Sequence, residues 1–218
     1  MTTYVLGLDL GPAAEFTVLA VVQATWSADP SPDLQVGYLR RFPPGTPYTA
    51  IAREVARLRA DDRLSGAHLV VDVTAVGAGV LELFRSMDTQ PDLVPVVITV
   101  GHSTERGPTA TWRVPKKDLV TGLQLLLQDR RLHIAAGLPE AKLLSQELVH
   151  FRARTKLMVD PQQAEWREGQ DDDLVLAVAL ACWQVSRTPV CPESGFSVFP
   201  RDSPLAMGSS FRGGRPPW

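Results

Sequence analysis

Three acidic positions stand out because each lies beside a strongly apolar segment. Asp9 falls within the apolar run 4–11, Asp72 within the run 68–73, and Asp173 directly before the apolar run 174–181. An acid in a buried segment costs free energy unless a partner offsets the charge, and no Lys or Arg precedes Arg40. A bound cation is the partner we expect for Asp9, although an aspartate that caps the turn after a strand remains an alternative.

Carboxylates that gather at one place repel one another, by about 1 kcal/mol at 4 Å in water and about 4 at an effective dielectric of 20. Mg²⁺ and Mn²⁺ prefer hard oxygen ligands. Two such ions activate water and stabilise the leaving oxygen in phosphodiester hydrolysis. If the strands of Asp9 and Asp72 are neighbours, the acids predict a two-metal site. Separate structural acids are the alternative, because a helix N-terminus by itself favours carboxylates such as those at 171–173.

The composition limits the classes of protein to which the chain can belong. The 218 residues are 44% hydrophobic and 21% charged, which is typical of a globular protein. The formal net charge of −2 gives no overall basic field, so any DNA-binding surface must be local. Cys182 and Cys191 form no metal-ligand pattern and indicate a reducing, cytoplasmic compartment. We find no signal peptide, and the longest apolar run, 174–183, is shorter than the roughly 20 residues that span a bilayer.

The first half of the chain predicts an α/β fold. Three strands joined by short turns predict an antiparallel β-meander, and the strand–helix–strand order that follows predicts parallel pairing through right-handed crossovers. Strands are expected at 4–11, 16–25, 34–42, 68–73 and 93–100, and helices at 48–64 and 80–87.

The second half is more helical. Residues 101–115 are polar and irregular, and we predict no regular element there. The remaining expectations are helices at 115–129, 139–151 and 171–187, a short strand at 131–135 and a β-hairpin at 152–167. From residue 188 the sequence is rich in Pro, Gly and Ser. We therefore predict a domain at 1–187 and a C-terminal tail at 188–218.

Four segments resemble the nuclease domain of the large terminase subunit of tailed bacteriophages. They are 7–22, 70–84, 114–134 followed by 138–151, and 171–183, and their order and spacing cover the chain up to about residue 187. The resemblance implies an RNase H-like (RuvC-type) fold, a mixed central sheet flanked by helices. The first segment alone would also fit actin-like sugar kinases or RuvC-type resolvases.

The resemblance also implies site residues and a reaction. The family's metal-binding and catalytic acids fall on Asp9, Asp72 and Asp173, with Asp172 and Glu15 as further acids near two Mg²⁺ or Mn²⁺ ions. The implied activity is endonucleolytic cutting of double-stranded DNA during viral genome packaging, in the host cytoplasm if the protein is viral. Implied partners are a terminase ATPase domain or subunit, the small terminase and the portal, with no membrane.

The chain departs from the family at two points. Asp171 stands where the family often has histidine, and no Gly-x-x-x-x-Gly-Lys-Ser/Thr motif for ATP is present. Gly77 and Gly79 lack the following lysine, and we expect them to let a helix approach the sheet closely. We expect an excised domain or a separately encoded nuclease half.

Two basic clusters are candidates for contact with DNA phosphates, although solvated helix faces explain them equally well. They comprise Arg113, Lys116 and Lys117 beside Trp112, and Arg152, Arg154 and Lys156.

Three other functions remain open. A Holliday-junction resolvase of the same fold would act as a dimer on four-way junctions. A non-catalytic module of a packaging motor would tolerate replacement of the acids. An actin-like phosphotransferase half would need a second phosphate-binding repeat, and we find none in the sequence.

Overall fold

The computed structural model describes residues 1–27, 29, 31–64, 66–87, 93–107, 109–135, 137–157 and 172–188, with the backbone alone for 151–157. These residues belong to one compact unit, Met1–Thr188. The domain division expected at residue 187 stays a prediction, because residues 189–218 lie outside the described part. No described helix is long and apolar enough to cross a membrane.

The described residues form an eight-stranded mixed sheet with the order β6-β7-β5-β4-β1-β2-β3-β8. Strands β1 to β3 pair antiparallel, as the short turns between them predict. Strands β4, β5 and β7 then run parallel to β1 and to one another. The strands are β1 (Thr2–Asp9), β2 (Thr17–Thr25), β3 (Asp33–Phe42), β4 (His68–Asp72), β5 (Leu93–Thr99), β6 (Glu105–Arg106), β7 (Trp112–Pro115) and β8 (Leu132–Ile134).

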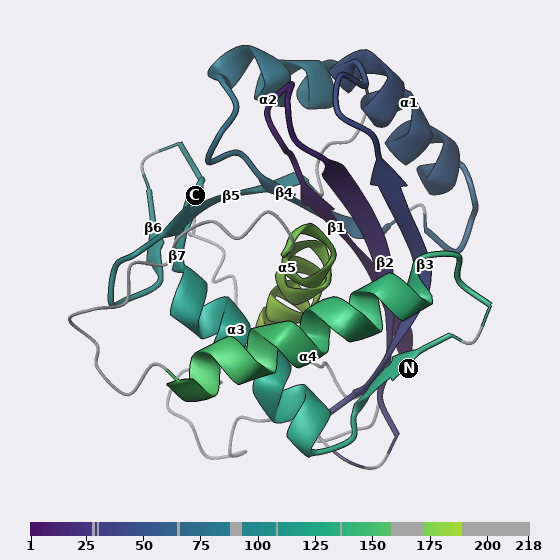
Figure 1. Cartoon of the computed structure of the whole chain (residues 1–218). Helices are drawn as coiled ribbons and strands as arrows, with labels where there is room; N and C mark the ends of the chain where they lie inside the picture. The colour runs from purple at the N-terminus through teal and green to yellow at the C-terminus, as the bar shows by residue number, and fades with distance from the viewer. Residues whose placement is uncertain are drawn as a thin grey trace, which may run out of the picture. The chain divides into compact units, whose positions relative to one another are not determined.

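Helices cover both faces of the sheet, and the expected fold class is confirmed. Figure 1 shows α1 and α2 on one face and α5 on the other, with α3 and α4 outside α5. The helices are α1 (Tyr48–Arg59), α2 (Ala78–Ser86), α3 (Lys116–Gln128), α4 (Ala141–Leu157) and α5 (Asp173–Arg187).

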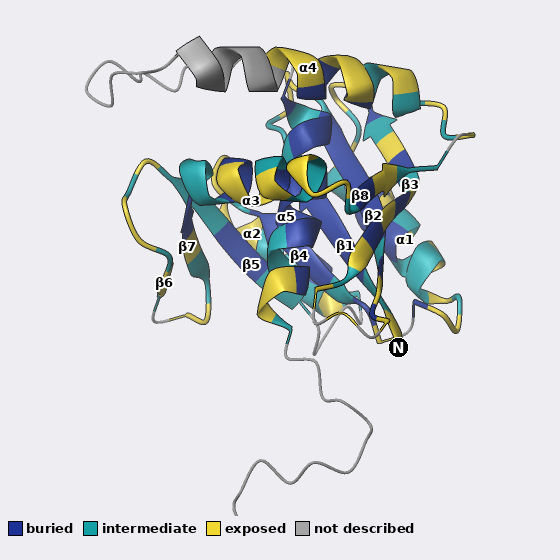
Figure 2. Cartoon of the chain, turned by 90° about the horizontal axis from the view of Figure 1, so that it is seen from below, coloured by how far each residue is buried: buried dark blue, intermediate teal, exposed yellow. Residues whose placement is uncertain are grey.

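Alternation along β1 divides the core into two layers, because successive strand residues point to opposite faces. Leu6 and Leu8 are fully buried against α1 and α2. Val5 belongs to the core on the α5 side, so Gly7 and Asp9, which follow at steps of two, face α5 as well. Figure 2 shows the central strands dark blue, whereas α3 and α4 carry exposed yellow surface on their outer sides.

Helix α5 is apolar on nearly every side because it is enclosed. Nine of its residues are buried, and they share one core with the sheet, α3 and α4. A helix that is hydrophobic all round fits only in such an interior position. Because the rest of the helix is buried, the acids at its N-terminus also lie close to the interior of the molecule.

Two expectations about the second half of the chain are wrong. Residues 101–115 contain β6 and β7, and β7 extends the sheet by pairing with β5; four residues are too few for a periodic signal. The hairpin expected from residue 152 is replaced, up to Leu157, by the continuation of α4. Ala, Arg, Lys and Leu in this segment favour helix. Residues 158–167 lie outside the described residues.

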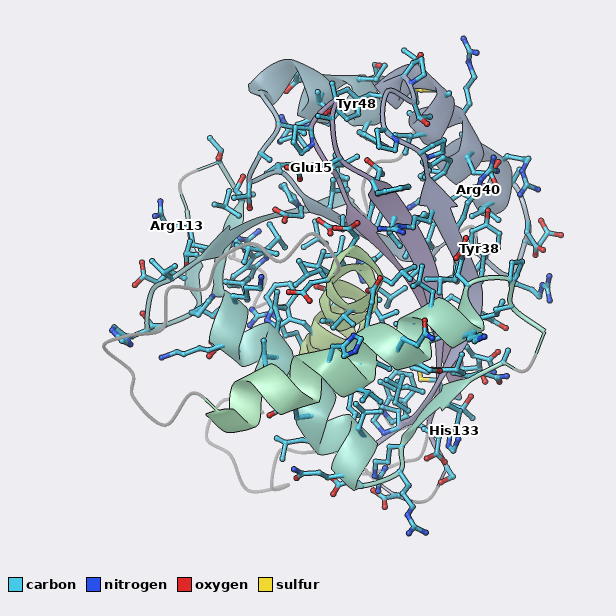
Figure 3. The ribbon with its side chains drawn as sticks, in the orientation of Figure 1. Glu15, Tyr38, Arg40, Tyr48, Arg113 and His133 are labelled. Carbon is cyan, nitrogen blue, oxygen red and sulfur yellow. The ribbon has the colours of Figure 1, made fainter. Side chains whose placement is uncertain are left out.

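One charged cluster ties β3 to α1. Glu54 accepts hydrogen bonds from the Tyr38 hydroxyl at 2.6 Å and from two nitrogens of Arg57 at 2.8 and 2.9 Å. Arg40 Nη1 lies 2.9 Å from the same carboxylate. Figure 3 shows Tyr38 and Arg40 side by side on β3. The hydrogen bonds from Arg57 are the main reason that the pKa of Glu54 falls to about 2.

A lowered folded-state pKa means that Glu54 stabilises the fold above its unfolded pKa, and that this contribution is lost as the pH falls through about 2. We expect Glu54→Gln to lower the free energy of unfolding near neutral pH by about 1 kcal/mol, because exposed arginines are screened by solvent. The difference from wild type should vanish in acid. Urea unfolding as a function of pH tests this, and a difference that persists unchanged at pH 2 would contradict it.

Candidate active site

Asp9 and Asp72 lie side by side at the ends of two neighbouring parallel strands. The register of β1 and β4 pairs them directly. Val5 and Val70 belong to the core on the α5 side, so both acids, an even number of residues further along, point to that face. The sequence-based condition that their strands be neighbours is therefore met.

Helix α5 reaches these acids because β1 has no side chain at Gly7. A Cβ atom at Gly7 would lie 2.0 Å from the backbone oxygen of Ala177, so the helix packs directly on the strand backbone. Asp173 lies one helical turn before Ala177, and Asp9 lies two residues beyond Gly7. The helix and the strand thus run in opposite directions and bring the two acids to the same end.

The close approach expected at Gly77 and Gly79 is wrong, because a Cβ atom at either position would meet no atom within 4 Å. Gly77 is the N-cap residue of α2. The glycine that allows a helix to touch the sheet is Gly7, inside the first strand.

The electrostatics of the site follow from this gathering of acids. Burial, followed by the charges of Asp72 and Asp173, raises the pKa of Asp9 well above its usual range, while Lys116 opposes the shift. Burial also raises the pKa of Asp72, and hydrogen bonds from Thr74 counteract it. We refer to Asp9, Asp72, Asp172 and Asp173 as the carboxylate site.

Asp72 is held in a fixed orientation by the turn after β4. The backbone N–H of Thr74 donates to Asp72 Oδ1 at 2.8 Å, and the Thr74 hydroxyl donates to the same oxygen. The backbone N–H of Ile98 on β5 in turn donates to the Thr74 hydroxyl oxygen at 2.8 Å. The turn after β4 therefore orients Asp72 directly, and β5 supports this orientation through Thr74.

Two cations balance part of the negative charge. Arg41 Nη2 on β3 donates to Asp173 Oδ2 at 3.2 Å, and its guanidinium lies 3.6 Å from the centre of the Phe16 ring. Lys116 Nζ, at the start of α3, lies 3.8 Å from Asp172 Oδ2, and the lysine side chain is only 13% exposed. Lys116, expected from the sequence as a DNA contact, thus lies against the acids.

The donor set fits a hard divalent cation, because the carboxylate site offers oxygen atoms and excess negative charge. Within the described residues, no three His, Cys, Asp or Glu side chains are arranged so that they hold one ion together. Arg41 and Lys116 engage two of the four acids, as the contacts above show. Ion binding would therefore require Asp173 and Asp172 to give up their contacts with Arg41 and Lys116 and to coordinate the ion instead.

The other candidate residues are more dispersed. Glu15 is exposed in the turn after β1, and its charge still raises the pKa of Asp9. Arg113 is exposed on β7, across the sheet from His133 on β8 (Figure 3). Lys117 Nζ lies 3.2 Å from His102 Nδ1. Arg152, Arg154 and Lys156 fall on α4, but their side chains, like the whole of Asp171, lie outside the described residues.

Sequence reasoning missed two residues beside the site, Arg41 and Glu147. Glu147 lies on α4 in register with the buried Leu144 and Leu148 and is itself only 3% exposed. Positions 144, 147 and 148 fall on one face of a helix, so an acidic residue at 147 interrupts an otherwise apolar face. This interruption could have been noticed in the sequence. Arg41 follows Leu39 at the spacing that places both on the α5 side of β3, which is a similar signal.

The chain is similar to solved structures of nuclease domains from viral terminases. The large terminase nuclease from thermophilic phage G20c superposes with a TM-score of 0.51 at 18% identity, covering 84% of this chain and 82% of that one. The Mn-bound g2p (large terminase) nuclease domain of bacteriophage SPP1 gives 0.49 at 12% identity, covering 84% and 86%. The Mn-soaked human cytomegalovirus terminase nuclease domain gives 0.46 at 17% identity, covering 82% and 81%.

The mixed sheet with helices on both faces is an RNase H-like α/β fold. Within that class, the chain has the fold of the phage G20c large terminase nuclease, which confirms the fold expected from the sequence. No family model matches the sequence, and no curated protein matches it.

The packing of α5 on β1 can be tested at Gly7. We expect Gly7→Ala to lower the free energy of unfolding by about 3 kcal/mol, because the backbone of a buried helix must move to admit the new methyl group. Thermal unfolding measures this loss.

Gly37 in β3 is the matched control, since a Cβ atom there would meet nothing within 4 Å. Gly37→Ala should leave the unfolding temperature nearly unchanged. Equal losses in the two variants would show that the contact with Ala177 is not what requires glycine at position 7.

Proposed function

We propose that the chain is a divalent-metal-dependent endonuclease that cuts double-stranded DNA during viral genome packaging. One observation carries the proposal: Asp9 and Asp72 are paired in register at one end of the sheet, and α5 brings Asp173 to the same end. Like charges concentrated in this way raise the energy of the folded protein. Such an arrangement is expected where cations and a phosphate group complete the site.

In the proposed reaction, Asp9, Asp72 and Asp173 would hold two Mg²⁺ or Mn²⁺ ions, with Asp172 and Glu15 as secondary ligands. When bound, such ions lower the pKa of water and stabilise the leaving 3′ oxygen in phosphodiester hydrolysis. The protein supplies no covalent nucleophile; its carboxylates orient the reacting groups. Thr74 keeps Asp72 directed into the site through two hydrogen bonds.

The basic residues would position the DNA backbone. Lys116 and Arg41 touch the acids, and both would be released towards a phosphate once cations neutralise the carboxylates. Lys117 and Arg113, further along the same edge, would extend the contact. Arg152, Arg154 and Lys156 on α4 complete the proposed DNA surface. A terminase ATPase domain or subunit, the small terminase and the portal are the partners we propose.

Plasmid cleavage tests the proposed activity. Wild type should cut in Mn²⁺ or Mg²⁺ and not in EDTA, whereas Asp9→Asn, Asp72→Asn and Asp173→Asn should each lose about a hundredfold or more in rate, because each removes one anionic ligand. Asp33→Asn is the control, since Asp33 is exposed at the opposite end of the sheet.

Failure of folded wild-type protein to cut under any metal would reject the nuclease and favour a non-catalytic assembly module. Preferential cutting of four-way junctions over plasmid duplex would instead favour a resolvase.

The charge repulsion in the site predicts an unusual stability effect. In EDTA, Asp9→Asn should raise the free energy of unfolding by about 1 kcal/mol, because it removes a desolvated charge facing Asp72 and Asp173. Excess Mn²⁺ should stabilise wild type and have little effect on the variant. Thermal unfolding with and without Mn²⁺ measures both effects. A variant less stable than wild type in EDTA would argue against repulsion at this site.

A further inference from the structure

The N-terminus of α5 is capped by a side chain from another helix. Asp172, the N-cap residue, makes no side-chain capping hydrogen bond. Instead, Glu147 Oε2 on α4 accepts the backbone N–H groups of Leu174 at 3.1 Å and Val175 at 3.3 Å. These are the second and third residues of the helix, whose N–H groups have no acceptor within α5.

This contact lies in the interior. Glu147 is 3% exposed, and Leu174 and Val175 are fully buried. A buried carboxylate costs free energy unless it is hydrogen-bonded, and unpaired N–H groups at a buried helix end also cost free energy. Each partner therefore satisfies the other, and removal of Glu147 would leave two donors without the acceptor that they have in this structure.

Asp173 is directly bonded to the capped segment, since it is the first residue of α5. Fixing the N–H groups of the next two residues fixes the rotation of the first helical turn, and with it the direction in which Asp173 leaves the helix. Burial raises the pKa of Glu147 to about 7, the two N–H groups oppose the shift, and the charge of Asp173 adds to it. The carboxyl group of Glu147 thus interacts electrostatically with Asp173 and accepts hydrogen bonds from the two residues that follow Asp173.

We propose that Glu147 is a positioning residue of the carboxylate site, which fixes the first turn of α5 so that Asp173 meets Asp9 and Asp72. The inference rests on the proposed function for its catalytic consequence, but not for the capping geometry. Glu147 acts through the backbone of α5 and takes no part in the reaction itself.

Arg41 completes the arrangement from the other side. Its guanidinium donates to Asp173 from β3, and its charge lowers the pKa of Glu147. The first turn of α5 is therefore held between α4 and β3. An apolar residue at position 147 would fill the interior equally well, but it would offer no acceptor to the helix.

The test uses the 218-residue chain without DNA and measures Mn²⁺ binding from the electron paramagnetic resonance signal of free Mn²⁺. Glu147→Ala should weaken binding about tenfold, because loss of a group that orients a ligand typically costs this much. Glu147→Gln keeps an oxygen acceptor for both N–H groups and should stay within about threefold of wild type. Cleavage rates should follow the same order.

Two controls on α4 separate positioning from stability. Leu148→Ala removes a buried neighbour of Glu147 and should lower the unfolding temperature without changing the Mn²⁺ midpoint. Gln146→Ala changes an exposed residue and should alter neither. The proposal is overturned if Leu148→Ala weakens Mn²⁺ binding as much as Glu147→Ala, or if Glu147→Gln fails to rescue it.

Amide hydrogen exchange distinguishes failure of this inference from failure of the proposed function. Wild type that neither binds Mn²⁺ nor cuts DNA would reject the metal-dependent nuclease. Glu147→Ala should still accelerate exchange at Leu174 and Val175 relative to the centre of α5, because these two amides lose their acceptor. Unchanged exchange at both amides would reject the positioning role whatever the outcome with metal.

Discussion

The structure depends on one contact, the packing of α5 directly on β1 at Gly7. This contact allows a helix that is apolar on nearly every side to lie against the centre of the sheet. It also sets the depth at which the acids of α5 lie, next to the ends of β1 and β4. A side chain at position 7 would clash with the backbone of Ala177 and force the helix outward, and Asp173 would move away from Asp9 with it.

The gathered acids impose a second constraint, because the fold must tolerate their repulsion. Three contacts reduce this repulsion: Arg41 and Lys116 each pair with one aspartate, and Thr74 donates hydrogen bonds to Asp72. These contacts offset the repulsion only in part, since the pKa of Asp9 is raised by burial and by Asp72 and Asp173. A site that is costly in the free protein and favourable with cations present is consistent with the proposed chemistry and links stability to ion binding.

The supporting layer around the site comes from distant parts of the chain. Glu147 reaches α5 from α4, and Arg41 reaches it from β3. Each uses a charged group inside or beside the core, where an apolar residue would pack without desolvation cost. Both contacts are made to the first turn of α5. Through this turn, α4 and β3 are linked to the ends of the parallel strands β1 and β4.

The sequence by itself determined the fold class, because buried strands and an enclosed helix leave strong local patterns of apolar residues. It indicated Asp9, Asp72 and Asp173 since a carboxylate beside such a pattern is conspicuous. Only the tertiary structure decided that Gly7, and not Gly77 or Gly79, allows the close approach, that Lys116 turns towards the acids, and that Glu147 caps α5. These features are contacts between residues far apart in the chain, and no local periodicity records which side chain a distant backbone will meet.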